Sequence, residues 1–228
     1  MKKPLLLAVL LTFLINLTGC AEMNRDERST AFDLVNQATE TVQRFKGMPD
    51  LQVFAEYLQR ARGIIVLPSV IKGGFVLGGE VGHGVMLVKT DGGSWSYPAF
   101  YTLGAASFGP QMGLQKTEIL LILRSNKAVA AVLDNQGKLG ADAGITIGTI
   151  GQGAEISTTT NIGADVLAFA NSKIGLFGGA ALEGAVLVRR VDLNEAYYDK
   201  GATPKGILYQ GQGQNSHAAR LRAVLNAP

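Results

Sequence analysis

A serine and two histidines are the residues whose types could build a hydrolytic site. Ser107 lies in Ala105–Gly109, which mimics a Gly-x-Ser-x-Gly nucleophile elbow with alanine in place of the first glycine. Such an elbow needs a strand-to-helix turn and a histidine as general base. The chain contains only His83 and His217, and no clear helical pattern follows Ser107. We therefore expect a chance match at Ser107, a solvent-facing His83 and no catalytic residue.

Three glutamates lie in apolar, strand-like stretches: Glu80, Glu118 and Glu183. Burying an unpaired carboxylate is costly, so each of them needs a partner. One interpretation is a carboxylate pair for acid–base chemistry. The interpretation we favour is a set of internal salt bridges or backbone hydrogen bonds, but the sequence does not decide whether these glutamates are structural or functional. The candidate salt-bridge partners are basic residues in comparable stretches: Lys72, Lys173 and Arg189.

The phosphate-binding and metal-binding patterns that sequences can reveal do not occur. No Gly-x-Gly-x-x-Gly opens a helix after a strand, no Gly-Lys-Ser/Thr loop exists, and metal-ligand spacings are lacking. We predict neither a cofactor nor a metal.

Cys20 is the only cysteine, and it ends the run Leu17–Cys20. Ahead of it lie the basic start Met1–Lys3 and the apolar stretch Leu5–Leu17, which is shorter than the roughly 20 residues of a membrane span. The ending resembles the bacterial lipobox, in which the peptide is cut before the cysteine and palmitate-type chains are added. We expect a signal peptide over 1–19 and a lipidated tether over 20–30. Since Ala21 rather than aspartate follows, we expect the periplasmic face of the outer membrane.

The charge of the mature chain is nearly balanced. Lys2 and Lys3 leave with the predicted signal, so the 21 basic residues become 19 against 18 acidic ones. Nucleic-acid affinity rests on neutralising phosphates, so no nucleic-acid partner is expected. Acylated Cys20 would leave no free thiol, which excludes disulfides and cysteine nucleophiles. Attachment to a membrane must then rest mainly on the acyl chains.

The elements that would position these residues follow from the apolar pattern. Thr30 with Asp33 resembles a capping box that opens a helix closing at Gly47, and Pro49 opens a second helix. From Gly63 onward, short apolar and glycine-rich runs predict strands, with Ile64–Leu67 stopped by Pro68. Residues 215–226 predict a C-terminal helix. The expected fold is α+β, with a curved antiparallel sheet, barrel- or sandwich-like, two N-terminal helices and a C-terminal helix. A weak echo between 72–91 and 173–192 suggests two similar halves.

Several motifs, in order along the chain, resemble the SYLF lipid-binding domain family, in its bacterial lipoprotein branch. They are Ala61–Val66, Val70–Phe75, Gly82–Leu87, Asp91–Pro98, Ser172–Gly179, Leu182–Gly184 and Asn194–Tyr198. The resemblance covers residues 31 to 209, and we assign the domain to 31–228. It implies a non-enzymatic module that binds membrane lipid, with an anionic phospholipid or phosphoinositide-like headgroup.

The resemblance also implies a headgroup-facing surface, for which the basic residues near its opening motifs are the candidates: Arg44, Lys46, Arg60, Arg62 and Lys72. The alternative for these side chains is an ordinary solvated helix end. Relatives in this family include actin-binding proteins, but no actin is expected in the periplasm. The alternative function is an envelope protein that docks a protein partner and uses its lipid only as a tether.

Overall fold

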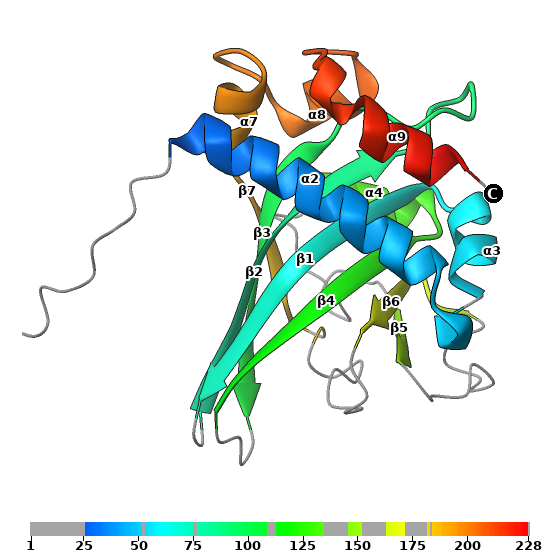
Figure 1. Cartoon of the computed structure of the whole chain (residues 1–228), viewed down its shortest axis with the longest axis vertical. Coiled ribbons are helices and arrows are strands. Elements are labelled where there is room, and N and C mark those ends of the chain that lie inside the picture. The colour runs from blue at the N-terminus through cyan, green and yellow to red at the C-terminus, as the bar shows by residue number, and fades with distance from the viewer. Residues whose placement is uncertain are drawn as a thin grey trace, which may run out of the picture.

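The computed structural model describes residues 26–227, apart from 52, 75–76, 109–112, 135–145, 152–162, 172–181 and 183. Within this part, seven strands form one open sheet in the order β5-β6-β4-β1-β2-β3-β7 (Figure 1). Every pairing is antiparallel except β5 with β6, which is parallel. The strands are β1 (Gly63–Gly74), β2 (Leu77–Val88), β3 (Ala99–Phe108), β4 (Gly113–Leu123), β5 (Ile147–Gly151), β6 (Val166–Ala170) and β7 (Val186–Arg189).

Helices cover both faces of the sheet. Side chains of α2 (Glu27–Lys46), α3 (Val53–Arg60), α7 (Val191–Tyr197) and α9 (Ala219–Asn226) pack on one face, which we call the outer face. Those of α4 (Asn126–Asp134) and α8 (Pro204–Tyr209) pack on the other, the inner face. Two 3-10 turns, Pro49–Leu51 and Ser216–Ala218, precede α3 and α9. No helix in the described ranges is long and apolar enough to cross a membrane.

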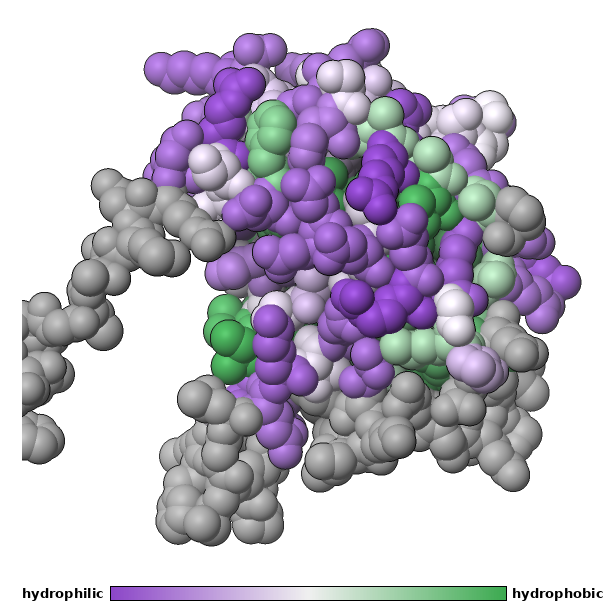
Figure 2. Space-filling view, in the orientation of Figure 1, coloured by the Kyte–Doolittle hydropathy of each residue, from purple (hydrophilic) through white to green (hydrophobic). Residues whose placement is uncertain are grey.

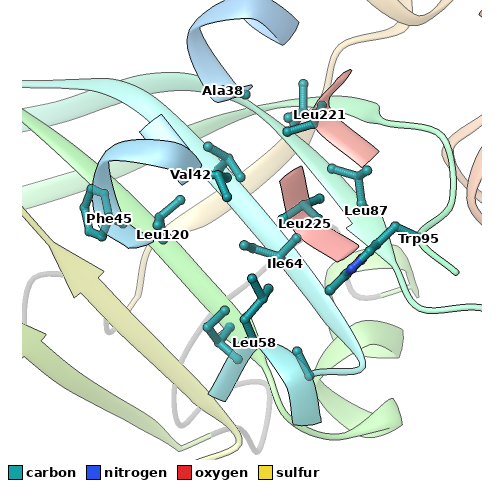
Figure 3. Packing of buried hydrophobic residues seen from close by; sticks show 14 of the residues in the cluster. Ala38, Val42, Phe45, Leu58, Ile64, Leu87, Trp95, Leu120, Leu221 and Leu225 are labelled. Carbon is teal, nitrogen blue, oxygen red and sulfur yellow. The ribbon is translucent and has the colours of Figure 1, made fainter. Parts of the chain in front are cut away.

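The centre of the sheet is buried on both sides. In β1, Ile64 and Val66 join the outer cluster while Ile65 and Leu67 join the inner one, and all four are 0% exposed. Figure 3 shows how the outer layer closes over them: Val42 of α2, Leu58 of α3 and Leu225 of α9 surround Ile64. A continuous apolar run is what two-sided burial requires.

Strand β1 continues past the proline that we expected to stop it. Its pairing with β2 shifts register between Val66 and Ser69, and its pairing with β4 shifts between Leu67 and Val70. Pro68 lies at this irregularity, where a missing backbone N–H costs no ladder hydrogen bond. Beyond the shift, Val70 joins the inner core while Ile71 is exposed.

The first helix begins earlier than the capping-box pattern indicated. Asp26 is the N-cap and accepts a hydrogen bond from the Arg28 amide, so α2 starts at Glu27 inside the segment expected to be a tether. The rest of the prediction for this helix is confirmed, because Gly47 caps its C-terminus and its expected apolar stripe is buried. That stripe consists of Ala31, Val35, Ala38, Val42 and Phe45.

The α+β class, the two N-terminal helices and the C-terminal helix are confirmed. The sheet is not closed into a barrel, and its β5–β6 pair departs from the expected antiparallel arrangement. Strand β3 and helices α7 and α8 were not predicted. Much of the suspected repeat over 173–192 lies outside the described residues.

Close backbone contact between β1 and β2 yields a first prediction. A Cβ atom added to Gly84 would overlap the carbonyl oxygen of Val66 and approach Leu67 Cδ2 at 2.8 Å. Gly84→Ala should therefore lower the free energy of unfolding by about 3 kcal/mol in urea denaturation. Gly104→Ala is the control, because its Cβ would meet nothing within 4 Å. Its effect should stay within about 0.5 kcal/mol, and equal losses in both variants would contradict the explanation.

Candidate functional site

The predicted cation Arg44 holds α2 to the sheet. Its Nη2 lies 2.6 Å from Glu118 Oε1, and its Nε donates to Oε2 at 3.1 Å. The same carboxylate accepts hydrogen bonds from Thr41 in α2 and from Asn171 after β6. Burial alone would raise the pKa of Glu118, but these hydrogen bonds and the charge of Arg44 outweigh burial and lower it. Glu118 thus has a structural role, which is the interpretation the sequence favoured.

The other outer-face cations have separate environments. Lys46 donates to the carbonyl oxygens of Val224 and Ala227, which end α9. Arg60 forms a helical i,i+4 pair with Glu56 at 3.2 Å, with both side chains well exposed. Arg62 is exposed between α3 and β1.

Lys72 does not share a surface with these four residues. It lies on the inner face opposite Glu80 in the β1–β2 ladder, and the two side chains are 5% and 0% exposed. Its Nζ lies 3.0 Å from Glu80 Oε1. Glu80 accordingly forms the internal salt bridge that was one of its two expected interpretations. The five predicted cations are therefore not assembled into one headgroup-facing surface.

The remaining predicted residues are placed as follows. His83 is an exposed side chain of β2, as expected, and its Nδ1 lies 2.8 Å from Thr102 Oγ1 and 3.2 Å from Arg190 Nη1. Partial burial and the positive charge of Arg190 lower the His83 pKa, although Asp192 opposes this. Ser107 lies in β3, and the next described element is the strand β4, not a helix. Cys20 and Glu183 lie outside the described residues.

A cavity that the sequence did not predict opens on the inner face. Its volume is about 550 Å³, and it lies among α4, β3, β7 and α8. The walls include Val132 and Leu133 of α4 and Leu187 of β7, and Tyr101 of β3 lines it as well. Two basic residues, Arg189 and Lys205, also line the cavity, and both are exposed. The rest of the lining consists of Val186, Val188, Thr203 and Pro204.

Local structure explains how these two cations reach the cavity. Arg189 stands opposite Tyr101 in the β3–β7 ladder, so both side chains belong to the inner face. Thr203 caps α8 by accepting a hydrogen bond from the Gly206 amide at 3.1 Å. Pro204 then fills the first helical position, where its missing N–H costs nothing, and Lys205 follows in the first turn.

The chemistry of the cavity is amphipathic. Its described lining carries apolar side chains and two cations but no carboxylate. Burial raises the pKa of Tyr101 while the charge of Arg189 opposes this, so the phenol stays neutral and can donate a hydrogen bond. The volume is in the usual range for small-molecule sites. These features fit a ligand with an apolar body and an anionic end.

The Arg44–Glu118 contact predicts a pH-dependent effect on stability. Glu118→Gln should lower the free energy of unfolding at pH 7 by about 1 to 3 kcal/mol, because bonds to a charged group are lost. The lowered pKa means that this contribution is complete above the ordinary glutamate value of about 4.3 and disappears as the pH falls through the folded-state value. Urea denaturation from pH 7 to pH 3 measures it.

Glu56→Gln is the matched control for this pair. The Glu56 and Arg60 side chains are both exposed. Loss of their ion pair should therefore lower the free energy of unfolding by less than about 0.5 kcal/mol at every pH. A difference between wild type and Glu118→Gln that persists undiminished at pH 3 would contradict the assignment.

Comparison with known proteins finds relatives that match most of this chain. The family model described as "Ysc84: Las17-binding protein actin regulator" matches residues 104–228. The chain is 35% identical over 173 residues to an SH3 domain-containing protein of Schizosaccharomyces pombe, covering 75% of this chain and 40% of that protein. It is 32% identical over 160 residues to Protein YSC84 of Saccharomyces cerevisiae, covering 69% and 34%.

A mammalian relative matches over a longer stretch. SH3 domain-containing YSC84-like protein 1 of Rattus norvegicus is 28% identical over 204 residues, covering 89% of this chain and 59% of the relative. The chain thus spans less than two thirds of the length of these curated relatives. Because the family model matches more than half of the chain, this protein belongs to the Ysc84 (SYLF) family.

Proposed function

We propose that this protein is a non-catalytic, lipid-binding lipoprotein of the cell envelope. Acylated Cys20 holds the domain at the periplasmic face of the outer membrane. The cavity among α4, β3, β7 and α8 binds a membrane lipid with an anionic phospholipid or phosphoinositide-like headgroup.

The cavity is the observation that supports this proposal. Apolar walls suit acyl chains, and Arg189 and Lys205 suit a phosphate at the mouth. The sequence supplies the rest, since the run ending at Cys20 resembles a lipobox and the motifs resemble the SYLF family. The cations that we first predicted as headgroup ligands contribute less, because Arg44, Lys46 and Lys72 are held by contacts within the domain.

Protein docking is the second candidate function. The names of the relatives support it, since one family description reads "Las17-binding" and a Saccharomyces cerevisiae relative is called LAS seventeen-binding protein 3. In the proposed compartment the partner would be an envelope protein rather than actin. A pull-down from detergent-solubilised envelopes would reveal a stoichiometric protein partner, and finding one without any lipid binding would favour this second function.

Vesicle binding tests the cavity directly. Residues 21–228 should sediment more completely with phosphatidylcholine vesicles that contain phosphatidylglycerol than with phosphatidylcholine alone. Each cation near an anionic surface contributes about 1 kcal/mol, so the double variant Arg189→Gln/Lys205→Gln should reduce partitioning about 30-fold.

The comparison variant is Arg60→Gln/Arg62→Gln, which removes the same charge from the two exposed outer positions that the sequence predicted as headgroup ligands. It should retain most of the binding. Equal loss in both double variants would mean that binding is diffuse electrostatics, and equal recovery of wild type in the supernatant for both vesicle types would refute lipid binding.

A further inference from the structure

The outer face carries an apolar patch that none of the described helices covers. Ile71 and Val81 are direct partners in the β1–β2 ladder and are 43% and 48% exposed. We call Ile71 and Val81 the outer patch. Exposed apolar side chains that adjoin each other on a sheet can mark an interaction site.

The patch exists because the strands are longer than the layer that covers them. Figure 1 shows β1 to β4 running well past α2, and Figure 2 shows a hydrophobic area beside that helix. A small groove of about 200 Å³ marks the boundary, with Leu34 of α2 on one side and Ile71 and Val81 on the other. Between Val81 and β7 stands Gly104, which adds no side chain to the surface.

The attachment point of the proposed lipid anchor lies beside this patch. Cys20 precedes Asp26 by six residues, which span at most about 20 Å even when fully extended. The charge of Glu27, the first residue of α2, acts on Arg190, and Arg190 contacts His83, two residues from Val81. The bilayer that holds the acyl chains is therefore within reach of the outer patch.

We infer that the outer patch rests on the bilayer that carries the acylated Cys20, an inference that depends on the proposed acylation. Lys116 stands opposite Ile71 in the β1–β4 ladder, is exposed, and adds a cation next to the apolar side chains. Asp33 lines the groove nearby, so apolar contact rather than net charge drives the docking. The cavity on the inner face then opens away from the anchoring bilayer.

Site-specific labelling of the acylated full chain tests the inference. Acylated Cys20 carries no thiol, so Val81→Cys introduces a single reactive site for an environment-sensitive fluorophore. After reconstitution into phosphatidylethanolamine–phosphatidylglycerol vesicles, the label should shift to the blue and be quenched by spin-labelled lipids. A label at Ala130→Cys, an exposed position on α4, is the control and should stay in water.

Two outcomes would overturn the inference. One is a label at 81 that stays as accessible to water as the label at 130. The other is shielding at 81 that appears without vesicles and grows with protein concentration, which would make the patch an interface between copies of the chain.

A second variant separates this inference from the proposed function. Ile71→Ser/Val81→Ser should weaken vesicle binding of the unacylated Cys20→Ser chain about tenfold, yet leave binding of monomeric short-chain phosphatidylglycerol in the cavity unchanged. If the wild-type chain does not bind short-chain phosphatidylglycerol, lipid binding in the cavity is refuted, but docking of the outer patch is not. Unchanged vesicle binding in the double variant would refute the docking but not the cavity.

Discussion

Two-sided burial of β1 is the constraint on which the rest of this structure depends. Its residues 64–67 alternate between two hydrophobic clusters, so at this position neither face of the sheet can remain in water. The outer face needs α2, α3 and α9, and the inner face needs α4 and α8. Gly84 lets β2 approach the irregular part of β1 closely enough to keep this pairing.

Three of the cations predicted for the headgroup surface bind partners within the domain instead. Arg44 with Glu118, Lys46 with the end of α9, and Lys72 with Glu80 each join segments that are distant in sequence or face each other in the sheet. A count of basic residues near the N-terminus therefore says little about lipid recognition. The cations that line an amphipathic space come instead from the second half of the chain, at Arg189 and Lys205.

Much of the fold could be predicted from the sequence because local patterns carry it. The stripe of α2, the C-cap at Gly47 and the apolar run of β1 depend on period and on neighbouring residues alone. Strand β3 was missed because Ala99–Phe108 contains glycine and small residues. The prediction that Pro68 ends β1 was wrong because Pro68 lies in a register shift, and that shift depends on two partner strands. The cavity combines Tyr101, Val132, Arg189 and Lys205, and only tertiary packing brings these four residues together.

The bonds from Lys46 to the end of α9 also bear on the order in which the domain can assemble. They join residues separated by 178 and 181 positions, and contacts so distant in sequence require the intervening chain to be ordered first. During synthesis, α2 emerges long before the helix that completes its packing. The outer layer can therefore be completed only after residues 219–226 have emerged, so α2 spends most of synthesis without part of the apolar surface that covers its stripe.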